Sequence, residues 1–479
     1  MSEIRSEIQR HGAMYLMSSL GITLAGFFAT IFYAHWVGAD ILGEYFLFLS
    51  YFSISCLITD FGIGYAGTKR ICEGRDPHRF FTTSLVLRLG IYLLLVIGLI
   101  TFQDRFVDLK QAGLFWLLII VVGITTLQST LGMAIGASNR LGLAASTTLI
   151  NNIVRIIIQV IAVFLGFQVY GLVGGLIAGI LLEMIIQLKF VDYHLERFGW
   201  SHIRSIFSFS GWVFLTSAGT VLFDYANLII IGYFLTVSDV GIFGICWTFS
   251  FLALFVSTAL CNTLYVKVSR WNIAGDRDTI STSLARATTY ALIFALPILA
   301  GGIILGERLL YYLYGPSFAV GATALVIIIA ARVFQSIYQL YSNYLMATDH
   351  VHMAFYGVGA GITINIVLSI LLVPILGLTG AALASLANMI ISTIIGRHFL
   401  RQIIPIIIEL SPITHIITAT AIMTSALLII NLLPYNQSLF LTVTMVLTGA
   451  VIYFLVLLKL NKQIRDDAFR TLKITWIPK

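Results

Sequence analysis

Polar side chains recur at helical spacing inside four long apolar stretches, and they are the residues whose chemistry stands out in this sequence. In residues 208–234 the polar positions follow steps of 4, 4 and 3, and they are Thr216, Thr220, Asp224 and Asn227. Such steps put every side chain on one helix face. A charge in the middle of a membrane span costs roughly 2.5–3.5 kcal/mol. We therefore expect this face to meet a partner or a water-filled cavity.

Three further apolar stretches carry similar stripes of cations, amides and acids. The stripes are Arg332, Gln335, Gln339 and Asn343 in residues 320–345, Asn151, Arg155 and Gln159 in residues 142–165, and Glu183 and Gln187 in residues 172–190. Guanidinium and amide groups bind anions and hydroxyl groups. The stripes predict one hydrogen-bonding face on each helix, with these side chains as candidate substrate contacts.

The four intramembrane charges at mid-depth also admit a structural interpretation. Asp224 and Arg332 are candidates for one buried ion pair, and Arg155 and Glu183 for another. Either pair would fix a helix bundle and remain compatible with a cavity wall. If they do not pair, Asp224 and Glu183 are candidates for coupling transport to protons or sodium.

Three charges lie nearer the ends of their spans. Arg88 is about two turns from one end, where a long side chain can snorkel to the interface. Arg286 has a similar depth in its own span, so the two arginines are also candidates for flanking the mouth of a cavity. Asp60 is either a helix-end residue or a coupling carboxylate.

Composition identifies the environment in which these residues act. The 479 residues are 59% hydrophobic and 10% charged, with a mean hydropathy of +0.97. Soluble domains have far fewer apolar and more charged residues, so the chain is predicted to be an all-α polytopic membrane protein. The four scattered cysteines indicate neither a disulfide framework nor a metal cluster. No phosphate loop, zinc spacing or nucleophile elbow appears, so no metal, cofactor or catalytic residue is expected.

Apolar runs of about 18 or more residues predict about fourteen transmembrane helices, the first two near residues 13–36 and 43–65. An even number puts both termini on one side of the membrane. Among the connecting loops, the opposite side holds only Arg105, Lys110 and Arg308. The positive-inside rule therefore predicts that both termini are cytoplasmic. The loops are too short for a soluble catalytic domain.

An internal repeat organises these spans. Residues 12–88 recur without gaps 198 positions later, so that Gly43 corresponds to Gly241 and Arg88 to Arg286. GLVGGLIA at residues 171–178 is echoed by GLTGAALA at residues 377–384. The repeats predict two pseudo-symmetric six-helix lobes, residues 1–205 and 206–402. Residues 403–479 would then hold two additional spans and a cytoplasmic tail.

The same segments resemble a known group of transporters. VGADILGEYFLFLSYFSISCLITDFGIG at residues 37–64 and DYANLIIIGYFLTVSDVGIFG at residues 224–244 are similar to the polysaccharide and oligosaccharide flippases of the multidrug/oligosaccharidyl-lipid/polysaccharide exporter superfamily. YLYGPSF at residues 312–318 and LGLTGAALASLAN at residues 376–388 extend the resemblance. It implies two lobes around a cavity that opens alternately to each side, with a lipid-linked oligosaccharide as cargo.

The resemblance also implies a carrier lipid and partners. The carrier would be a polyprenyl or dolichyl phosphate or pyrophosphate, with Arg155 and Arg332 at its headgroup. Expected partners are the bilayer, the lipid-linked oligosaccharide and polysaccharide assembly proteins, with no nucleic acid, and the chain is expected to act as a monomer. Peptidoglycan-precursor flippases resemble one another in an Arg-Asp pair within the first helix, which residues 14–33 lack.

Three alternatives are another transporter, a membrane enzyme and a scaffold subunit. A cation-coupled multidrug exporter of the same superfamily would differ in cargo, although such exporters usually have twelve spans. A membrane glycosyltransferase or polymerase would need a large catalytic loop with paired acids, and the sequence has none. A scaffold subunit would have no use for polar stripes inside the membrane.

Overall fold

The computed structural model describes residues 2–138, 140–407, 409–432 and 438–466, and every regular element in these ranges is a helix. Thirteen of the described helices are long and apolar enough to cross a membrane. Their outer faces carry large apolar side chains, such as Leu93, Leu94 and Ile97 on α3, which are 60%, 69% and 63% exposed. A face of this kind is stable against lipid rather than water. The predicted all-α, multi-pass membrane fold is confirmed.

The difference between about fourteen predicted spans and thirteen arises at the N-terminus. The first two predicted spans both fall in helix α1 (Ser2–Asp60), whose backbone is non-helical at Gly38. Gly38 has φ 75° and ψ −177°, a conformation that glycine adopts without steric cost. The helix therefore consists of two arms joined by a kink.

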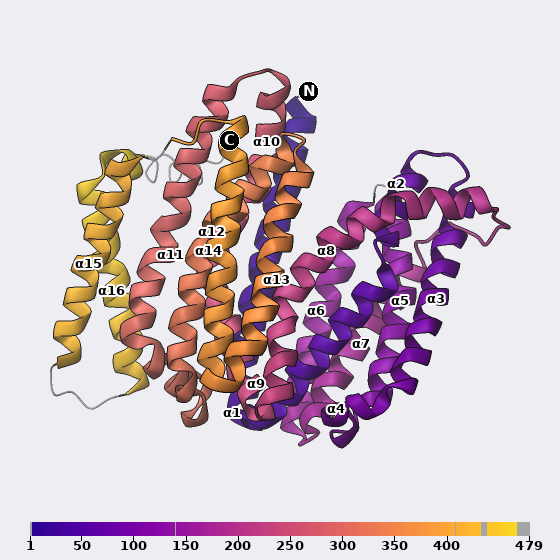
Figure 1. Cartoon of the computed structure of the whole chain (residues 1–479), viewed down its shortest axis with the longest axis horizontal. Coiled ribbons are helices and arrows are strands. Elements are labelled where there is room, and N and C mark those ends of the chain that lie inside the picture. Colours follow the sequence, from indigo (N-terminus) through magenta and orange to yellow (C-terminus); the bar gives the residue numbers. More distant parts are fainter. Residues whose placement is uncertain (1, 139, 408, 433–437, 467–479) are drawn as a thin grey trace. The chain divides into compact units, whose positions relative to one another are not determined.

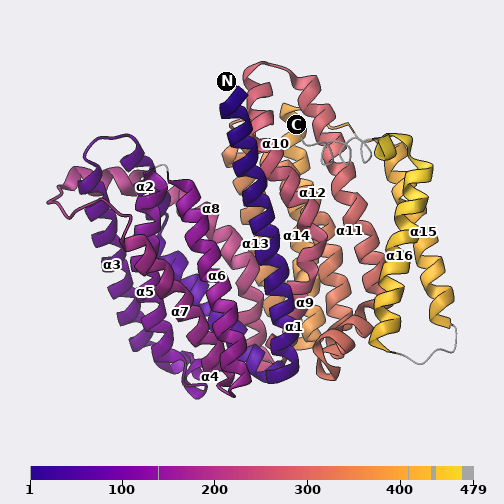
Figure 2. The same ribbon diagram turned by 180° about the vertical axis from the view of Figure 1, so that it is seen from behind.

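The chain divides into two compact units, residues 1–244 and residues 245–479. Unit 1 contains α1 and seven further α-helices, with α9 (Val237–Ser250) continuing into unit 2. These helices are α2 (Ile63–Cys72), α3 (Pro77–Thr101), α4 (Val107–Gln111), α5 (Phe115–Ala137), α6 (Leu141–Phe164), α7 (Gln168–Leu188) and α8 (Trp200–Phe234). Figures 1 and 2 show them in indigo to magenta. Within this unit α6 packs along α7, and α1 packs against both α6 and α8.

Unit 2 is built around α12. Its other helices are α10 (Phe255–Ile273), α11 (Arg277–Tyr314), α13 (Val351–Leu376), α14 (Leu378–Ile403), α15 (Leu410–Leu432) and α16 (Leu439–Leu460), and α12 itself is Ala322–Ala347. Short 3-10 turns, η1 (Gln103–Arg105), η2 (Phe251–Leu254) and η3 (Pro316–Gly321), occur in the connections. Helix α14 lies against α12 and α13, and α11 lies against α10 and α12 (Figure 1).

The last two helices form a hairpin attached to α11. Ile416, Met423 and Leu427 of α15 and Leu457 of α16 share a buried cluster with residues of α11. The Tyr453 hydroxyl donates a hydrogen bond of 2.7 Å to the Ile293 carbonyl oxygen. This arrangement agrees with an added helix pair. The predicted tail from residue 467 onward lies outside the described residues, and the division at residues 205 and 402 into symmetric lobes stays a prediction.

Candidate functional site

A polar network inside unit 1 lies where α6 meets α7 and α1. Gln159 of α6 is buried and saturated with hydrogen bonds. Its amide nitrogen donates to the Tyr45 hydroxyl at 2.9 Å and to the Leu172 carbonyl at 2.6 Å, and its oxygen accepts from the Tyr33 hydroxyl at 3.1 Å. Gln159 therefore ties three helices together, and its donors are already used within the protein.

A second group of hydrogen bonds surrounds Glu183 of α7, whose partners are all uncharged donors. Its carboxylate accepts from Asn151 Nδ2 at 2.6 Å, Thr148 Oγ1 at 3.1 Å and Gln187 Nε2 at 3.2 Å. The side chain is 5% exposed, and among the described residues no cation forms an ion pair with it. A buried carboxylate that has hydrogen bonds but no counter-charge offers oxygen ligands to a small cation.

Arg155 lies between these two groups on the same face of α6. Its Nη2 donates to Asn152 Oδ1 at 2.9 Å, and the side chain is half-buried. Among the described residues no carboxylate forms an ion pair with Arg155, so of the two alternatives the structural ion pair with Glu183 is not formed, and neutral donors surround Glu183 instead. The hydroxyls of Tyr33 and Tyr45 are within electrostatic reach of the guanidinium. Arg155 thus combines a positive charge with partial exposure.

Glycines on α7 make this arrangement possible. A Cβ on Gly175 would collide with Gln159 and with the carbonyl of Arg155, and one on Gly179 would collide with Asn151. Glycines spaced four residues apart, such as Gly171, Gly175 and Gly179, let helix backbones approach closely. The contacts show this approach between α6 and α7, and they show that the glycines leave room for the polar side chains of α6.

Arg88 has a different environment from the one predicted. Its side chain is only 2% exposed, and its Nη2 is paired with the carboxylate of Asp60. Nη1 also donates to Ser129 Oγ at 3.2 Å and Thr130 Oγ1 at 3.1 Å. The snorkelling interpretation is therefore wrong, because a carboxylate and two hydroxyls replace the interface as partners.

Asp60 closes the end of α1 as expected of a helix-end residue. Its carboxylate accepts hydrogen bonds from the backbone of Gly62 at 3.2 Å and of Gly64 at 3.3 Å, as well as from Arg88. Its donors are thus two backbone N–H groups and the buried guanidinium of Arg88. This geometry favours an ion pair over a coupling role for Asp60.

Arg332 is enclosed within unit 2. Its guanidinium carbon lies 4.0 Å from the ring centre of Trp247 and 4.1 Å from that of Phe251, and the side chain is 1% exposed. Nε donates to Ser250 Oγ at 2.9 Å and Nη1 to Gln335 Oε1 at 2.6 Å. Aromatic rings on a guanidinium stabilise it electrostatically. The contacts support a structural role for Arg332 and Gln335 in this unit.

The remaining predicted side chains are scattered over both units. Gln339 accepts a hydrogen bond of 3.1 Å from Ser257 Oγ, and the buried Oδ1 of Asn343 has no hydrogen-bond partner among the described residues. Asp224 is half-buried on α8 beside Tyr225, whose hydroxyl is hydrogen-bonded to Ser53. Asp224 belongs to unit 1 and Arg332 to unit 2. An ion pair between them stays a prediction.

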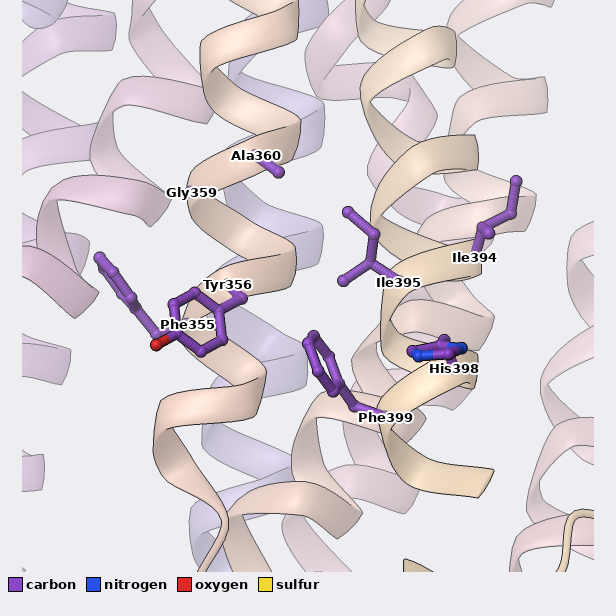
Figure 3. A pocket seen from close by; sticks show the side chains of 8 residues that line it. All are labelled: Phe355, Tyr356, Gly359, Ala360, Ile394, Ile395, His398 and Phe399. Carbon is purple, nitrogen blue, oxygen red and sulfur yellow. The ribbon is translucent and has the colours of Figure 1, made fainter. Parts of the chain in front are cut away.

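A separate groove of about 630 Å³ lies on α13 and α14 (Figure 3). Phe355 and Tyr356 of α13 and Ile395 and Phe399 of α14 line it, and Gly359 leaves it open. Its lining is almost entirely apolar, with His398 at one side. The groove is suited to hydrocarbon and offers little to a charged headgroup.

Sequence reasoning missed two sets of polar residues. Tyr33 and Tyr45 were counted among the apolar residues of their spans, although the i, i+12 spacing and the hydroxyls were visible. His78, His194 and Glu196 meet within 4.8 Å between the start of α3 and the segment before α8. Glu196 also faces Arg79 at 3.4 Å, so the group already contains a cation that balances the carboxylate. The prediction that the protein has no metal site stays a prediction.

Comparisons with known proteins agree with this fold. A family model described as "Polysaccharide biosynthesis protein" matches residues 37–323, which is more than half of the chain. The probable low-salt glycan biosynthesis flippase Agl15 of Haloferax volcanii is 24% identical over 449 residues, covering 93% of this chain and 94% of that protein.

Two solved structures share the fold. The lipid II flippase MurJ in its inward closed conformation has a TM-score of 0.76 and 18% sequence identity, covering 93% of this chain and 98% of that one. An inward-facing multidrug resistance MATE family transporter of the MOP superfamily has a TM-score of 0.62 and 15% identity, covering 80% of this chain and 94% of that one. At these identities the likeness extends to the fold alone. The family model and the similarity to a probable glycan biosynthesis flippase confirm the predicted resemblance to polysaccharide and oligosaccharide flippases.

Proposed function

Because the chain belongs to the polysaccharide biosynthesis protein family, we propose that it is a flippase that moves a lipid-linked oligosaccharide from the cytoplasmic to the outer leaflet. The similarity to a probable glycan biosynthesis flippase supports this cargo. Transport by alternating access of two lobes fits the internal repeat of the sequence. The carrier would be a polyprenyl or dolichyl phosphate or pyrophosphate whose tail stays in the bilayer.

The observation that carries the proposal is the state of Arg155. It is a half-buried guanidinium on a membrane helix, and its hydrogen-bond partner among the described residues is the neutral amide of Asn152. An intramembrane cation without a counter-ion is costly unless it has a ligand or water. A phosphate or pyrophosphate headgroup offers two acceptor oxygens that the planar guanidinium can bind in a bidentate manner. Asn151 and Gln159 hold the helix that presents it.

The orientation and assembly follow from the same proposal. The concentration of Lys and Arg on one side supports cytoplasmic termini. The chain would act as a monomer and receive its cargo from polysaccharide assembly proteins. Glu183 and Asp224 are the proposed coupling residues, whereas Arg88, Asp60 and Arg332 are proposed to stabilise the bundles. Gln339 and Asn343 stay candidate sugar contacts on α12.

The experiment is a translocation assay in liposomes. Purified protein is reconstituted with a fluorescent lipid-pyrophosphate oligosaccharide, and protection of the label from an external quencher is followed over time. We expect the wild-type protein to speed exchange between leaflets and Arg155→Ala to reduce it to the rate of empty liposomes. Thermal unfolding in detergent checks that Arg155→Ala is folded.

Arg140→Ala is the matched control, because Arg140 precedes the same helix but is exposed and paired with Asp192 at 3.1 Å. It should transport normally. If the wild-type protein does not move the glycolipid but does move a cationic dye down an ion gradient, the protein is a multidrug exporter and the proposal is wrong. The likeness to the MATE transporter is the reason for including this dye.

A further inference from the structure

A groove of about 530 Å³ lies between α10 and α11 within unit 2, apart from the polar network of α6 and α7. Figures 1 and 2 show these two helices side by side. One wall is a polar stripe of α11 with steps of four, and the other is the apolar face of α10. The residues used below are Asp278, Thr282, Ser283, Arg286, Leu264 and Trp271.

Arg286 is a free cation in this groove. It is exposed, and among the described residues its guanidinium has neither an ion pair nor a hydrogen bond. Its counterpart in the first repeat, Arg88, is buried and paired with Asp60. The position that corresponds to Asp60 in the second repeat is Thr258, which has no charge. The second copy therefore keeps the arginine without the carboxylate that neutralises it in the first.

The other lining residues complement a polyhydroxylated anion. Thr282 and Ser283 place hydroxyl groups one turn from Arg286, and Ser283 Oγ is 2.9 Å from the Tyr344 hydroxyl. Asp278 is two turns from Arg286, about 12 Å along the helix axis. It offers a carboxylate acceptor for hydroxyl groups at the opposite end of the groove from the cation. The groove has the size of a small-molecule site, for which roughly 300–1,000 Å³ is typical.

The position of Trp271 favours a sugar over a simple anion as the ligand of this groove. Its indole ring, with Leu264, forms the wall opposite the α11 stripe, and the side chain is half-buried. An indole face packs well against the apolar face of a pyranose ring, whose hydroxyls then point sideways to polar partners. An inorganic anion would gain nothing from this wall.

We propose that the α10–α11 groove is a binding site for the sugar phosphate portion of a glycolipid, with Arg286 at the phosphate, Trp271 against the first sugar ring and Asp278 at its hydroxyls. This inference rests on the proposed flippase function. Lys267 and Arg270 near the end of α10 and Arg277 at the start of α11 flank the short connection between these helices, so the groove lies next to the side proposed to be cytoplasmic.

The test is binding of a soluble hexose 1-phosphate to the full-length protein in nanodiscs, measured by isothermal titration calorimetry. Arg286→Gln should weaken binding roughly tenfold or more, because a charge-assisted hydrogen bond is lost. Arg277→Gln is the matched control, since Arg277 is exposed at the start of the same helix but does not line the groove. It should leave binding unchanged. Trp271→Phe, which preserves packing, should weaken the binding of hexose 1-phosphate but not of inorganic phosphate.

Further arms separate the possible ligands. If inorganic phosphate binds as tightly as hexose 1-phosphate, the sugar contact does not exist and the proposal is overturned. Equal weakening by Arg277→Gln and Arg286→Gln would also overturn it, because it would show attraction by the basic residues at this end of the helices in general. If the wild-type protein moves the glycolipid in liposomes while Arg286→Gln binds hexose 1-phosphate normally, the flippase function stands and the groove assignment fails. If Arg286-dependent binding is found but no glycolipid moves, the flippase function is the part that fails.

Discussion

Gly43 and Gly241 occupy equivalent positions of the internal repeat, and they lie against each other within unit 1. A Cβ on Gly241 would meet the carbonyl of Ala39 and lie 3.0 Å from the backbone nitrogen of Gly43. A Cβ on Gly43 would meet the carbonyl of Val237, which is the repeat counterpart of Ala39. The contact is thus reciprocal, as in an interface related by a two-fold axis. It gives the sequence repeat a physical counterpart at one point of the fold.

Replacing either glycine should therefore be costly. We predict that Gly43→Ala and Gly241→Ala each destabilise the protein by about 1–3 kcal/mol, because the new methyl group overlaps backbone atoms that cannot move aside. Thermal unfolding in detergent measures the effect. Gly90→Ala is the control: its Cβ would meet nothing within 4 Å. It should be neutral or slightly stabilising, since alanine favours the helix. Equal stability of all three variants would contradict the close contact.

The Asp60–Arg88 pair yields a second prediction. Asp60→Asn should lower stability by about 1–3 kcal/mol, because it leaves the buried guanidinium of Arg88 without a counter-charge while the side chain of residue 60 is itself 40% exposed. The same measurement on Glu73→Gln tests an exposed pair, whose carboxylate is 2.9 Å from Arg70. That variant should change stability by less than about 1 kcal/mol. The double variant Asp60→Asn, Arg88→Met should recover part of the loss, and no recovery would argue against the pair.

The sequence predicts the helices of the fold more completely than it predicts the contacts between side chains in the candidate site. Hydropathy and period 3.6 spacing identify which residues lie in membrane helices and which face of a helix is polar, and the stripe on α6 was found in this way. Spacing does not say which helix lies opposite. From spacing, Arg155 is therefore only one candidate partner of Glu183, whereas in the structure the hydrogen-bond partners of Glu183 are Thr148, Asn151 and Gln187.

The errors have a common physical cause. Arg88 and Asp60 are 28 positions apart on different helices, so their contact depends on the packing of α1 and α3 rather than on any local pattern. The enclosure of Arg332 by Trp247 and Phe251 likewise arises from tertiary packing of α9, η2 and α12. Counting the charged residues within predicted spans cannot separate buried, paired charges from charges that face a cavity. Their burial by partners or exposure to a cavity is decided only when the helices assemble.

Arg332 and Arg155 should accordingly respond differently to substitution. We predict that Arg332→Lys lowers the thermal stability of the protein by about 1–3 kcal/mol, because lysine cannot keep both hydrogen bonds or the stacking between two rings. The fraction that remains folded should move the fluorescent glycolipid at the wild-type rate. A folded, stable Arg332→Lys variant that has lost transport would instead make Arg332 a substrate contact.

The last prediction concerns the coupling of transport. Glu183→Gln keeps the size of the side chain and removes the one charge from a group of neutral donors, so we expect a folded protein that still exchanges the glycolipid between leaflets. It should no longer be accelerated by an imposed proton or sodium gradient, because no carboxylate remains there for a cation to neutralise. Asp192→Asn is the control, since its carboxylate is exposed and pairs with Arg140; it should keep the response to the gradient. If Glu183→Gln retains that response, the coupling group lies elsewhere, and Asp224 becomes the next residue to replace.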